Sequence, residues 1–115
     1  MNTGAIRREQ FLYLTTTGRS TGAPHRIEIW FVQYNSRFYI VSQYGEDSDW
    51  IQNIKQEPKI VFEVHGSTFQ GIARVVAQKK EPELSKEVAK LMHEKYNWNE
   101  GTIVELRPEP GSIPN

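Results

Sequence analysis

The sequence contains no cysteine. A disulfide, a thiolate nucleophile and a cysteine-based zinc or iron–sulfur site are therefore all excluded. No apolar run approaches the ~20 residues that a membrane-spanning helix requires. The first ten residues, MNTGAIRREQ, also lack the apolar segment of a signal peptide. We therefore expect a cytoplasmic protein with no membrane span.

Net charge is absent too, because 14 Lys and Arg balance 14 Asp and Glu. This balance gives no support for nucleic-acid binding. The charges are unevenly spread, however. Residues 1–45 carry five Arg against two Glu, whereas residues 46–63 carry five acidic residues against two Lys. A basic first third that uses only Arg suits a small anion such as a phosphate, although an ordinary solvated surface has the same composition.

Familiar catalytic and metal-binding motifs are also missing. His25, His65 and His93 fall on an expected loop, turn and helix, without the spacing of metal ligands. The sequence has no Gly-x-Ser-x-Gly elbow and no GxxxxGK[ST] phosphate-binding loop. We therefore expect no metal site and no catalytic side chain. If the protein is an enzyme, a bound cofactor supplies the reactive atom and the chain orients it.

The sequence does contain enough apolar material for one small core. Of its 115 residues 37% are hydrophobic, and the aromatic ones are five Phe, five Tyr and three Trp. This composition excludes a disordered chain. The length suits a single domain over residues 1–115.

Six segments have the β-branched and aromatic composition of strands. We expect these strands at 11–17, 26–32, 38–41, 60–64, 68–76 and 102–106. Two helices are expected between them: a short one that begins at Asp47 or Ser48, and a longer one over 82–96 with a single apolar stripe. Residues 108–115, with three prolines, are expected to form a tail.

The expected fold class is mainly β (α+β), a six-stranded antiparallel barrel with one short and one longer helix. Segments 26–32 and 38–41 form the clearest hairpin. Gly71 lies within an expected strand, which indicates a bulge or a close approach to the backbone. The run Ile29–Val32 is wholly apolar, which is more than a small monomer readily covers, and an open sheet has exposed edges. We therefore expect a homodimer.

The first candidate site is the loop between the first two expected strands, TTTGRSTGAPHR over residues 15–26. Gly18 and Gly22 allow backbone N–H groups to turn towards an anion. Four side chains add donors that suit phosphate oxygens: those of Arg19, Ser20, Thr21 and Arg26. Composition alone favours a polar hairpin loop that binds nothing, because loops of Gly, Ser and Thr are common.

The second candidate site is the loop after residues 38–41 together with the short helix. Ser42 stands where a strand ends, so its hydroxyl and backbone can face a ligand. Trp50 and Asn53 lie three apart on the helix, which puts an aromatic plane beside an amide, and the helix N-terminus suits an anion. This pair suits a flat heteroaromatic ring, but Trp50 suits equally well a hydrophobic plug beneath a surface helix.

Several motifs in this order resemble the deazaflavin (F420)-dependent nitroreductase and quinone reductase family, which belongs to the split β-barrel flavin and deazaflavin oxidoreductases. The resemblance covers residues 10–77 and rests on TTGRSTGAP, on the Ser-x-x-Gly loop at 42–45 and on WIQNIKQEP before a strand. It implies a split β-barrel, usually a homodimer, with reduced F420 as hydride donor. The implied acceptor is an electron-poor small molecule such as a quinone, nitroaromatic or enone.

The resemblance also implies roles for individual residues. Those near the cofactor's phosphate and acidic tail come from the first loop: Arg19, Ser20, Thr21, His25 and Arg26. Those along the deazaflavin ring and its side chain come from the second segment: Ser42, Gln43, Gly45, Trp50 and Asn53. By position only, Tyr96 near the C-terminal helix is the expected substrate contact.

Two positions depart from the family pattern. His25 stands where many members carry Arg, and Gln43 stands where some carry Lys. Both differences remove positive charge from the groove that would hold the cofactor. FMN, with one phosphate, is therefore an alternative cofactor, and a non-catalytic carrier of a flavin, deazaflavin or other tetrapyrrole-like ligand is an alternative function.

Overall fold

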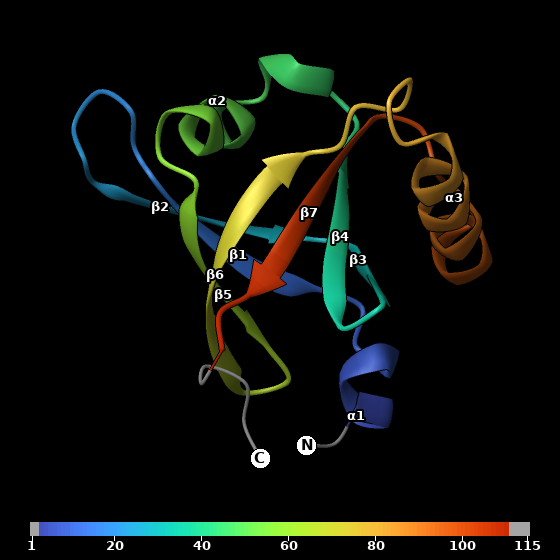
Figure 1. The fold of residues 1–115 in the computed structure, drawn as a ribbon. Helices are drawn as coiled ribbons and strands as arrows, with labels where there is room; N and C mark the ends of the chain where they lie inside the picture. The colour runs from blue at the N-terminus through green and yellow to red at the C-terminus, as the bar shows by residue number, and fades with distance from the viewer. Residues whose placement is uncertain (1–2, 111–115) are drawn as a thin grey trace.

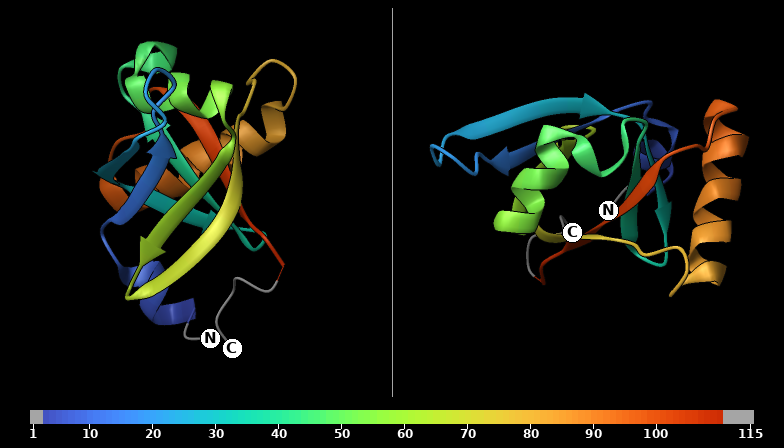
Figure 2. Two further views of the ribbon diagram at one scale, coloured as in Figure 1. Left: turned by 90° about the vertical axis from the view of Figure 1, so that its left-hand side faces the viewer. Right: turned by 90° about the horizontal axis from the view of Figure 1, so that it is seen from above.

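Seven β-strands form one antiparallel sheet in the computed structural model, which describes residues 3–110 (Figure 1). In chain order they are β1 (Leu12–Thr17), β2 (Pro24–Ile29), β3 (Phe31–Tyr34), β4 (Arg37–Ser42), β5 (Lys59–Val64), β6 (Ser67–Val75) and β7 (Thr102–Pro108). They lie side by side in the order β2-β1-β5-β6-β7-β4-β3. The sheet curls into a half-barrel, which confirms the mainly β, split-barrel class predicted from the sequence (Figures 1 and 2).

Helices cover one end and one side of this sheet. They are α1 (Thr3–Arg8), the short 3₁₀-helix η1 (Gly45–Asp47), α2 (Asp49–Gln56) and α3 (Pro82–Tyr96). Figure 1 shows α2 above one end of the sheet, α3 along its side and α1 towards the other end. The two predicted helices are α2 and α3, whereas α1 is too short for apolar periodicity to reveal it. Within residues 3–110 no helix has the length and hydropathy needed to cross a membrane.

The predicted number of six strands is wrong, because the segment expected to be one strand over 26–32 is two. β2 pairs with β1, where Ile29 lies opposite Leu12, and β3 pairs with β4, where Phe31 lies opposite Ile40. Trp30 is the residue between them. The chain thus leaves one edge of the sheet and joins the other, and the predicted hairpin with 38–41 involves β3 alone. The sequence does not reveal where β2 ends and β3 begins, because Ile29 at the end of β2 and Phe31 at the start of β3 are both apolar.

β4 is buried on both faces and joins two cores. Phe38 and Ile40 point into the barrel, where their neighbours include Phe62. Tyr39 and Val41 point the other way, into a second cluster beneath α3. This position between two layers explains why the strand is apolar at successive residues instead of at alternate ones.

β6 and β7 approach each other closely at Gly71. A Cβ atom at this position would lie 2.5 Å from the carbonyl oxygen of Arg107. The close approach predicted at Gly71 is therefore present. The pairing with β5 continues through Gly71 without a bulge, and the pairing with β7 begins there. Gly71 pairs with Pro108, so the predicted tail over 108–115 begins later than expected. Residues 111–115 of that tail lie outside the described part of the chain.

Candidate functional site

A cavity of about 900 Å³ lies along β2, below α2 and the loop that follows β4. Four residues of β2 line it: His25, Ile27, Glu28 and Ile29. The side chains of His25, Ile27 and Ile29 share one face because side chains alternate along a strand. Residues 41–44, α2 and Trp98 form the opposite walls. The volume is within the range of small-molecule and cofactor sites.

Half of the predicted cofactor-binding residues line this cavity. They are His25, Ser42, Gln43, Trp50 and Asn53. They come from both candidate segments, so the fold brings these two segments together as the predicted site requires. The other predicted residues do not line the cavity: Arg19, Ser20, Thr21, Arg26, Gly45 and Tyr96.

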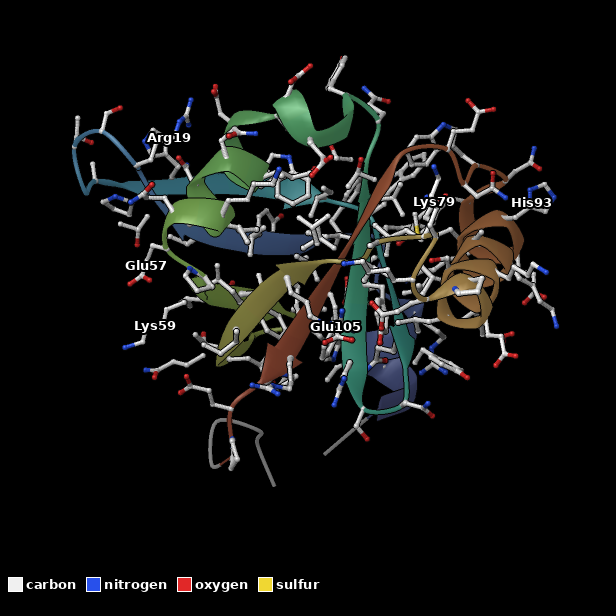
Figure 3. All side chains as sticks on the ribbon, turned by 45° about the horizontal axis from the view of Figure 1, so that its top comes forward. Arg19, Glu57, Lys59, Lys79, His93 and Glu105 are labelled. Atoms are coloured by element: carbon white, nitrogen blue, oxygen red, sulfur yellow. The ribbon has the colours of Figure 1, made fainter. Side chains whose placement is uncertain are left out.

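Arg19 lies at the α2 end of the cavity and is bound to that helix (Figure 3). Its guanidinium donates to Asn53 Oδ1 at 2.9 Å and pairs with the carboxylate of Asp49 at 3.1 Å. Its backbone N–H also donates to Asn53 Oδ1, at 3.2 Å. The buried Asn53 in turn donates from Nδ2 to Thr16 Oγ1 at 3.1 Å. Asn53 therefore fixes the loop 18–23 against α2.

The loop 18–23 is closed by its own hydrogen bonds. The N–H of Gly18 donates to the carbonyl of Ala23 at 2.7 Å, and the N–H of Gly22 donates to the carbonyl of Gly18 at 2.8 Å. These two N–H groups therefore do not face a ligand in the way the sequence suggested. A Cβ atom at Gly18 would lie 2.8 Å from His25 Nε2, so the histidine ring packs directly on the loop. Ser20 and Thr21 are exposed at its tip.

Ser42 organises the turn that leads into α2. Its hydroxyl donates to the carbonyl of Gly45 at 3.0 Å and lies 2.5 Å from the hydroxyl of Ser48. Ser48 also donates to the carbonyl of Gly45, at 3.2 Å. Gly45 thus contributes through its carbonyl and its left-handed backbone, φ +65°, and it supports the cavity wall from behind.

Arg26 faces away from the cavity. It lies between His25 and Ile27 on β2, so its side chain points to the opposite face of the sheet. There its guanidinium lies 4.3 Å from the centre of the Tyr13 ring and 3.8 Å from the carboxylate of Glu63. The two arginines of the predicted loop therefore occupy opposite faces of the sheet.

Tyr96 lies behind the cavity wall. Its ring stacks on Trp30 with centroids 4.5 Å apart and an interplanar angle of 5°. Its hydroxyl oxygen lies 2.9 Å from the carbonyl oxygen of Phe31 and 2.8 Å from that of Gln10, and it accepts the N–H of Phe31 at 3.1 Å. Burial raises the pKa of Tyr96 to about 12. Tyr96 is therefore a neutral anchor for the β2–β3 connection and a support for the Trp30 ring.

Four aromatic residues that sequence reasoning did not assign to the site also line the cavity. They are Phe11, Trp30, Tyr44 and Trp98. Trp30 belonged to an apolar run expected to enter the core, and Trp98 lies between a helix and a strand without a motif around it. Their only signal in the sequence is that they are large aromatic residues at the ends of elements, where a side chain can reach a shared opening.

Three acidic residues line the cavity within the described part of the chain: Glu28, Asp47 and Asp49. Glu28 alternates with Ile27 and Ile29, and its side chain contacts Tyr13 on the other face of the sheet, so the negative charge that faces the cavity comes from Asp47 and Asp49. No Lys or Arg is among these lining residues. The nearest guanidinium that the described contacts place at the cavity is that of Arg19, which bonds to Asn53 and Asp49. The positive charge available to an anionic ligand is therefore concentrated at the α2 end.

Solved structures share this fold at low sequence identity. The heme storage protein HutZ from Vibrio cholerae has a TM-score of 0.75 and 18% identity, over 95% of this chain and 88% of that one. An F420-H2 dependent reductase, FDR-A, has a TM-score of 0.70 and 18% identity, over 86% and 95%. An FAD-binding protein from Mesorhizobium loti has a TM-score of 0.70 and 14% identity, over 93% and 86%.

These structural similarities show the architecture alone, because proteins with one fold carry out different functions. A search of curated protein sequences finds no match. A family model, in contrast, matches nearly the whole chain, over residues 2–105, and its description is F420H(2)-dependent quinone reductase. The match includes every residue that lines the cavity. The chain therefore belongs to the F420H(2)-dependent quinone reductase family.

Proposed function

We propose that the protein transfers a hydride from reduced F420 to an electron-poor acceptor such as a quinone, a nitroaromatic or an enone. Membership of the family supports an F420-dependent oxidoreductase. The observation that carries the proposal is the cavity itself, which extends along β2 from the Arg19 end to a cluster of aromatic side chains. A planar redox cofactor needs such a site, with polar groups at one end and flat apolar walls beyond.

The residues present fit F420 at both of its ends. Trp50 and Asn53 of α2, together with residues 42–45, offer a flat ring and fixed polar groups for the deazaflavin. Arg19, Ser20, Thr21 and His25 offer donors for the phosphate end. The side chain of Arg19 is 40% exposed although it is bound to α2, so its guanidinium is still open to a second anion. Arg26, on the opposite face of the sheet, is not part of this proposed site.

When bound, reduced F420 supplies a hydride, which carries two electrons in one step. The work of the chain is then to orient the ring and to keep water away from it. Asn53 is suited to orientation because Thr16 and Arg19 hold its amide from both sides. The apolar wall of Ile27 and Ile29 is suited to the exclusion of water. If the cofactor supplies the hydride and the chain only orients the ring and excludes water, no catalytic motif is needed, which agrees with the sequence.

A second candidate function rests on the charge of the cavity. Because the acidic Asp47 and Asp49 line it, a cofactor with fewer negative charges than F420 is easier to accommodate. FMN, with one phosphate, is such a cofactor. A non-catalytic carrier is the related alternative, since similar folds include a heme storage protein and an FAD-binding protein.

Cofactor binding and turnover distinguish these functions. The purified protein, incubated separately with F420 and with FMN and then desalted, is expected to retain F420 and its visible absorbance. It is also expected to oxidise F420H2 in the presence of menadione. Retention of FMN instead would favour the FMN enzyme, and F420 that stays bound but is not oxidised would favour the carrier.

A pair of variants tests the assignment of Arg19. Arg19→Ala is expected to weaken F420 binding by roughly 1.5–3 kcal/mol, the range of a hydrogen bond to a charged group. Arg26→Ala is the matched control, because it removes the same charge from the same loop region on the other face of the sheet. Equal effects of the two substitutions on the Kd, measured by quenching of F420 fluorescence, would remove Arg19 from the site.

A further inference from the structure

A second cavity, of about 420 Å³, lies between β3 and α3. β3 is an edge strand whose one neighbour in the sheet is β4, and α3 packs against it. The volume suits a small molecule. This cavity shares no lining residue with the larger one, so it is a separate site. From β3 it is lined by Val32, Gln33 and Tyr34, and from α3 by Leu91, Glu94 and Lys95.

Gln33 brings three polar groups to the edge of β3 that faces α3. The N–H and C=O of Phe31 bond to Tyr96 and Lys95 of α3, so they point away from β4. In an antiparallel ladder the backbone groups of alternate residues point the same way, so the N–H and C=O of Gln33 also point away from β4. The side-chain Oε1 of Gln33 is buried and has no partner within the described residues. Native proteins seldom leave a buried acceptor without a donor, so this oxygen indicates that a ligand supplies one.

Lys95 brings a cation to the same cavity. Its side chain is half-buried, and its ammonium group donates to the carbonyl of Phe31 at 3.1 Å and lies 3.9 Å from the centre of the Phe31 ring. None of the ion pairs among residues 3–110 includes Lys95. Burial lowers the pKa of Lys95 to about 8, against the weaker opposing effect of the charge of Glu9. A carboxylate on a ligand would give this ammonium group the close counter-charge that the described chain does not give it.

The polar groups of this cavity match a ligand that carries both charges. The donors are the ammonium group of Lys95 and the N–H of Gln33, which suit a carboxylate. The acceptors are the C=O and Oε1 of Gln33 and the carboxylate of Glu94, which suit an ammonium group. Val32, Leu91 and the ring of Tyr34 leave an apolar wall for the rest of the ligand.

We propose that the cavity between β3 and α3 binds a free α-amino acid with an apolar side chain. Its carboxylate pairs with Lys95, its ammonium group binds Gln33 and Glu94, and its side chain lies against Leu91. A single amino acid fits better than a peptide strand, because the backbone groups of Phe31, the next to face outward along β3, are already bonded to α3. The proposal does not depend on the proposed function, since the two cavities share no residue.

Matched ligands test the recognition of both charges in the protein without F420. L-Leucine is expected to bind saturably in isothermal titration calorimetry at pH 7 and to raise the melting temperature. N-acetyl-L-leucine lacks the ammonium group and L-leucinamide lacks the carboxylate, and each is expected to bind at least about tenfold more weakly. Glycine, which lacks the apolar side chain, is also expected to bind more weakly than leucine. No saturable binding of leucine up to about 10 mM, or equal binding of leucine and either derivative, would overturn the proposal.

Gln33→Leu tests the site with a variant that is expected to fold. It removes the unpartnered acceptor, so the melting temperature of the free protein is expected to stay the same or to rise, while leucine binds at least about tenfold more weakly. Lys95→Gln is expected to weaken leucine binding as strongly. Lys90→Gln is its matched control, because Lys90 is exposed on the same helix and does not line the cavity. Unchanged leucine affinity in Gln33→Leu, or equal losses in the two lysine variants, would place leucine elsewhere.

The pH dependence of binding identifies Lys95 without relying on its effect on the fold. Only the protonated amine attracts the carboxylate, and the pKa of Lys95 in the free protein is about 8. The affinity for leucine is therefore expected to fall about fourfold between pH 7 and pH 8.5. The other ionisable groups around Lys95 are the carboxylates of Glu9 and Glu94 and the phenol of Tyr96, whose pKa is about 12. Lys95→Gln is expected to lack this dependence, and the same decline in both proteins would contradict the role of Lys95.

Discussion

Glu105 is a buried carboxylate that joins three strands on the α3 side of the sheet (Figure 3). Only 3% of it is exposed, and it accepts hydrogen bonds from Arg37 at 3.2 Å, Tyr39 at 2.9 Å and Arg74 at 3.1 Å. Burial opposes ionisation of this carboxyl, but the bonds from Arg74 and Tyr39 and the charges of the two arginines outweigh that effect, so its pKa is lowered. Arg74 also pairs with Glu81 and thereby connects the network to the start of α3.

Glu105→Gln is expected to lower the free energy of unfolding at neutral pH by about 2 kcal/mol, because a neutral amide replaces the buried carboxylate that accepts from Tyr39 and from the guanidiniums of Arg37 and Arg74. The folded pKa of Glu105 lies below that of the unfolded chain, so its stabilisation is complete above the unfolded value and is lost as the pH falls through the folded value. Urea unfolding between about pH 6 and pH 3 should therefore show a steeper loss in the unmodified protein than in the variant. If the free energy of unfolding falls equally with pH in both proteins, Glu105 does not have this role. Glu63→Gln, which removes an exposed ion pair, is the control.

Asp49 competes with the proposed cofactor for the guanidinium of Arg19. Its side chain is 88% exposed, and it both pairs with Arg19 and lines the cavity. Asp49→Asn removes this negative charge with little change in shape, so F420 is expected to bind about three to ten times more tightly, as the loss of about 1 kcal/mol of opposing Coulomb energy implies. A fluorescence titration at two salt concentrations checks this, because the gain should shrink in high salt. Weaker binding would indicate that Asp49 holds Arg19 in its binding position.

At the scale of the secondary-structure elements, most of the order along the chain could be predicted and one connection could not. Strand composition and helical periodicity predicted β1, β4 to β7, α2 and α3 because each of these elements carries its own pattern. The break at Trp30 carries no pattern, since Ile29 and Phe31 are both apolar and face different partners. Hydrogen bonds between Phe31 and the distant Tyr96 and Lys95 fix this connection, and local sequence patterns do not reveal them.

Gly71→Ala is expected to destabilise the pairing of β6 with β7. The added methyl group would lie 2.5 Å from a backbone carbonyl, which cannot move without shifting β7. We expect a loss of about 1–3 kcal/mol, the usual cost of overpacking. Thermal unfolding measures this loss. Thr68→Ala, at an exposed position of the same strand, is the control, and an equal change in the two variants would contradict the close approach.

At the scale of the whole molecule, β2 and β3 are the two edges of the sheet, and each pairs with one neighbour only. Ile27, Ile29 and Trp30 are only partly buried at this side, and Phe11 is exposed. We propose that a second copy of the chain covers part of this surface, because exposed edges and apolar faces favour association. Light scattering at micromolar concentrations is expected to give twice the chain mass of 13.4 kDa. A mass of one chain would contradict the dimer.

The candidate site shows a similar limit of sequence reasoning. The two segments that bear its residues were predictable, because each carries a compact motif. The direction of individual side chains was not, because Arg19 and Arg26 look alike in the sequence and lie on opposite faces of the sheet. The contact between the Trp30 and Trp98 rings was not predictable either, because these residues are 68 positions apart and only the fold brings them together.

The burial of β4 on both faces has a consequence for motion. Its side chains belong to the barrel core and to the layer beneath α3, so neither layer can come apart while the other keeps its packing. Amide protons of Ile40 and Val41 should therefore exchange for deuterium only when the entire chain unfolds, whereas those of the loop 18–23 should exchange through local opening. We expect a protein built this way to melt in a single cooperative transition, while the loop 18–23 opens by breaking only its own few hydrogen bonds and those to α2.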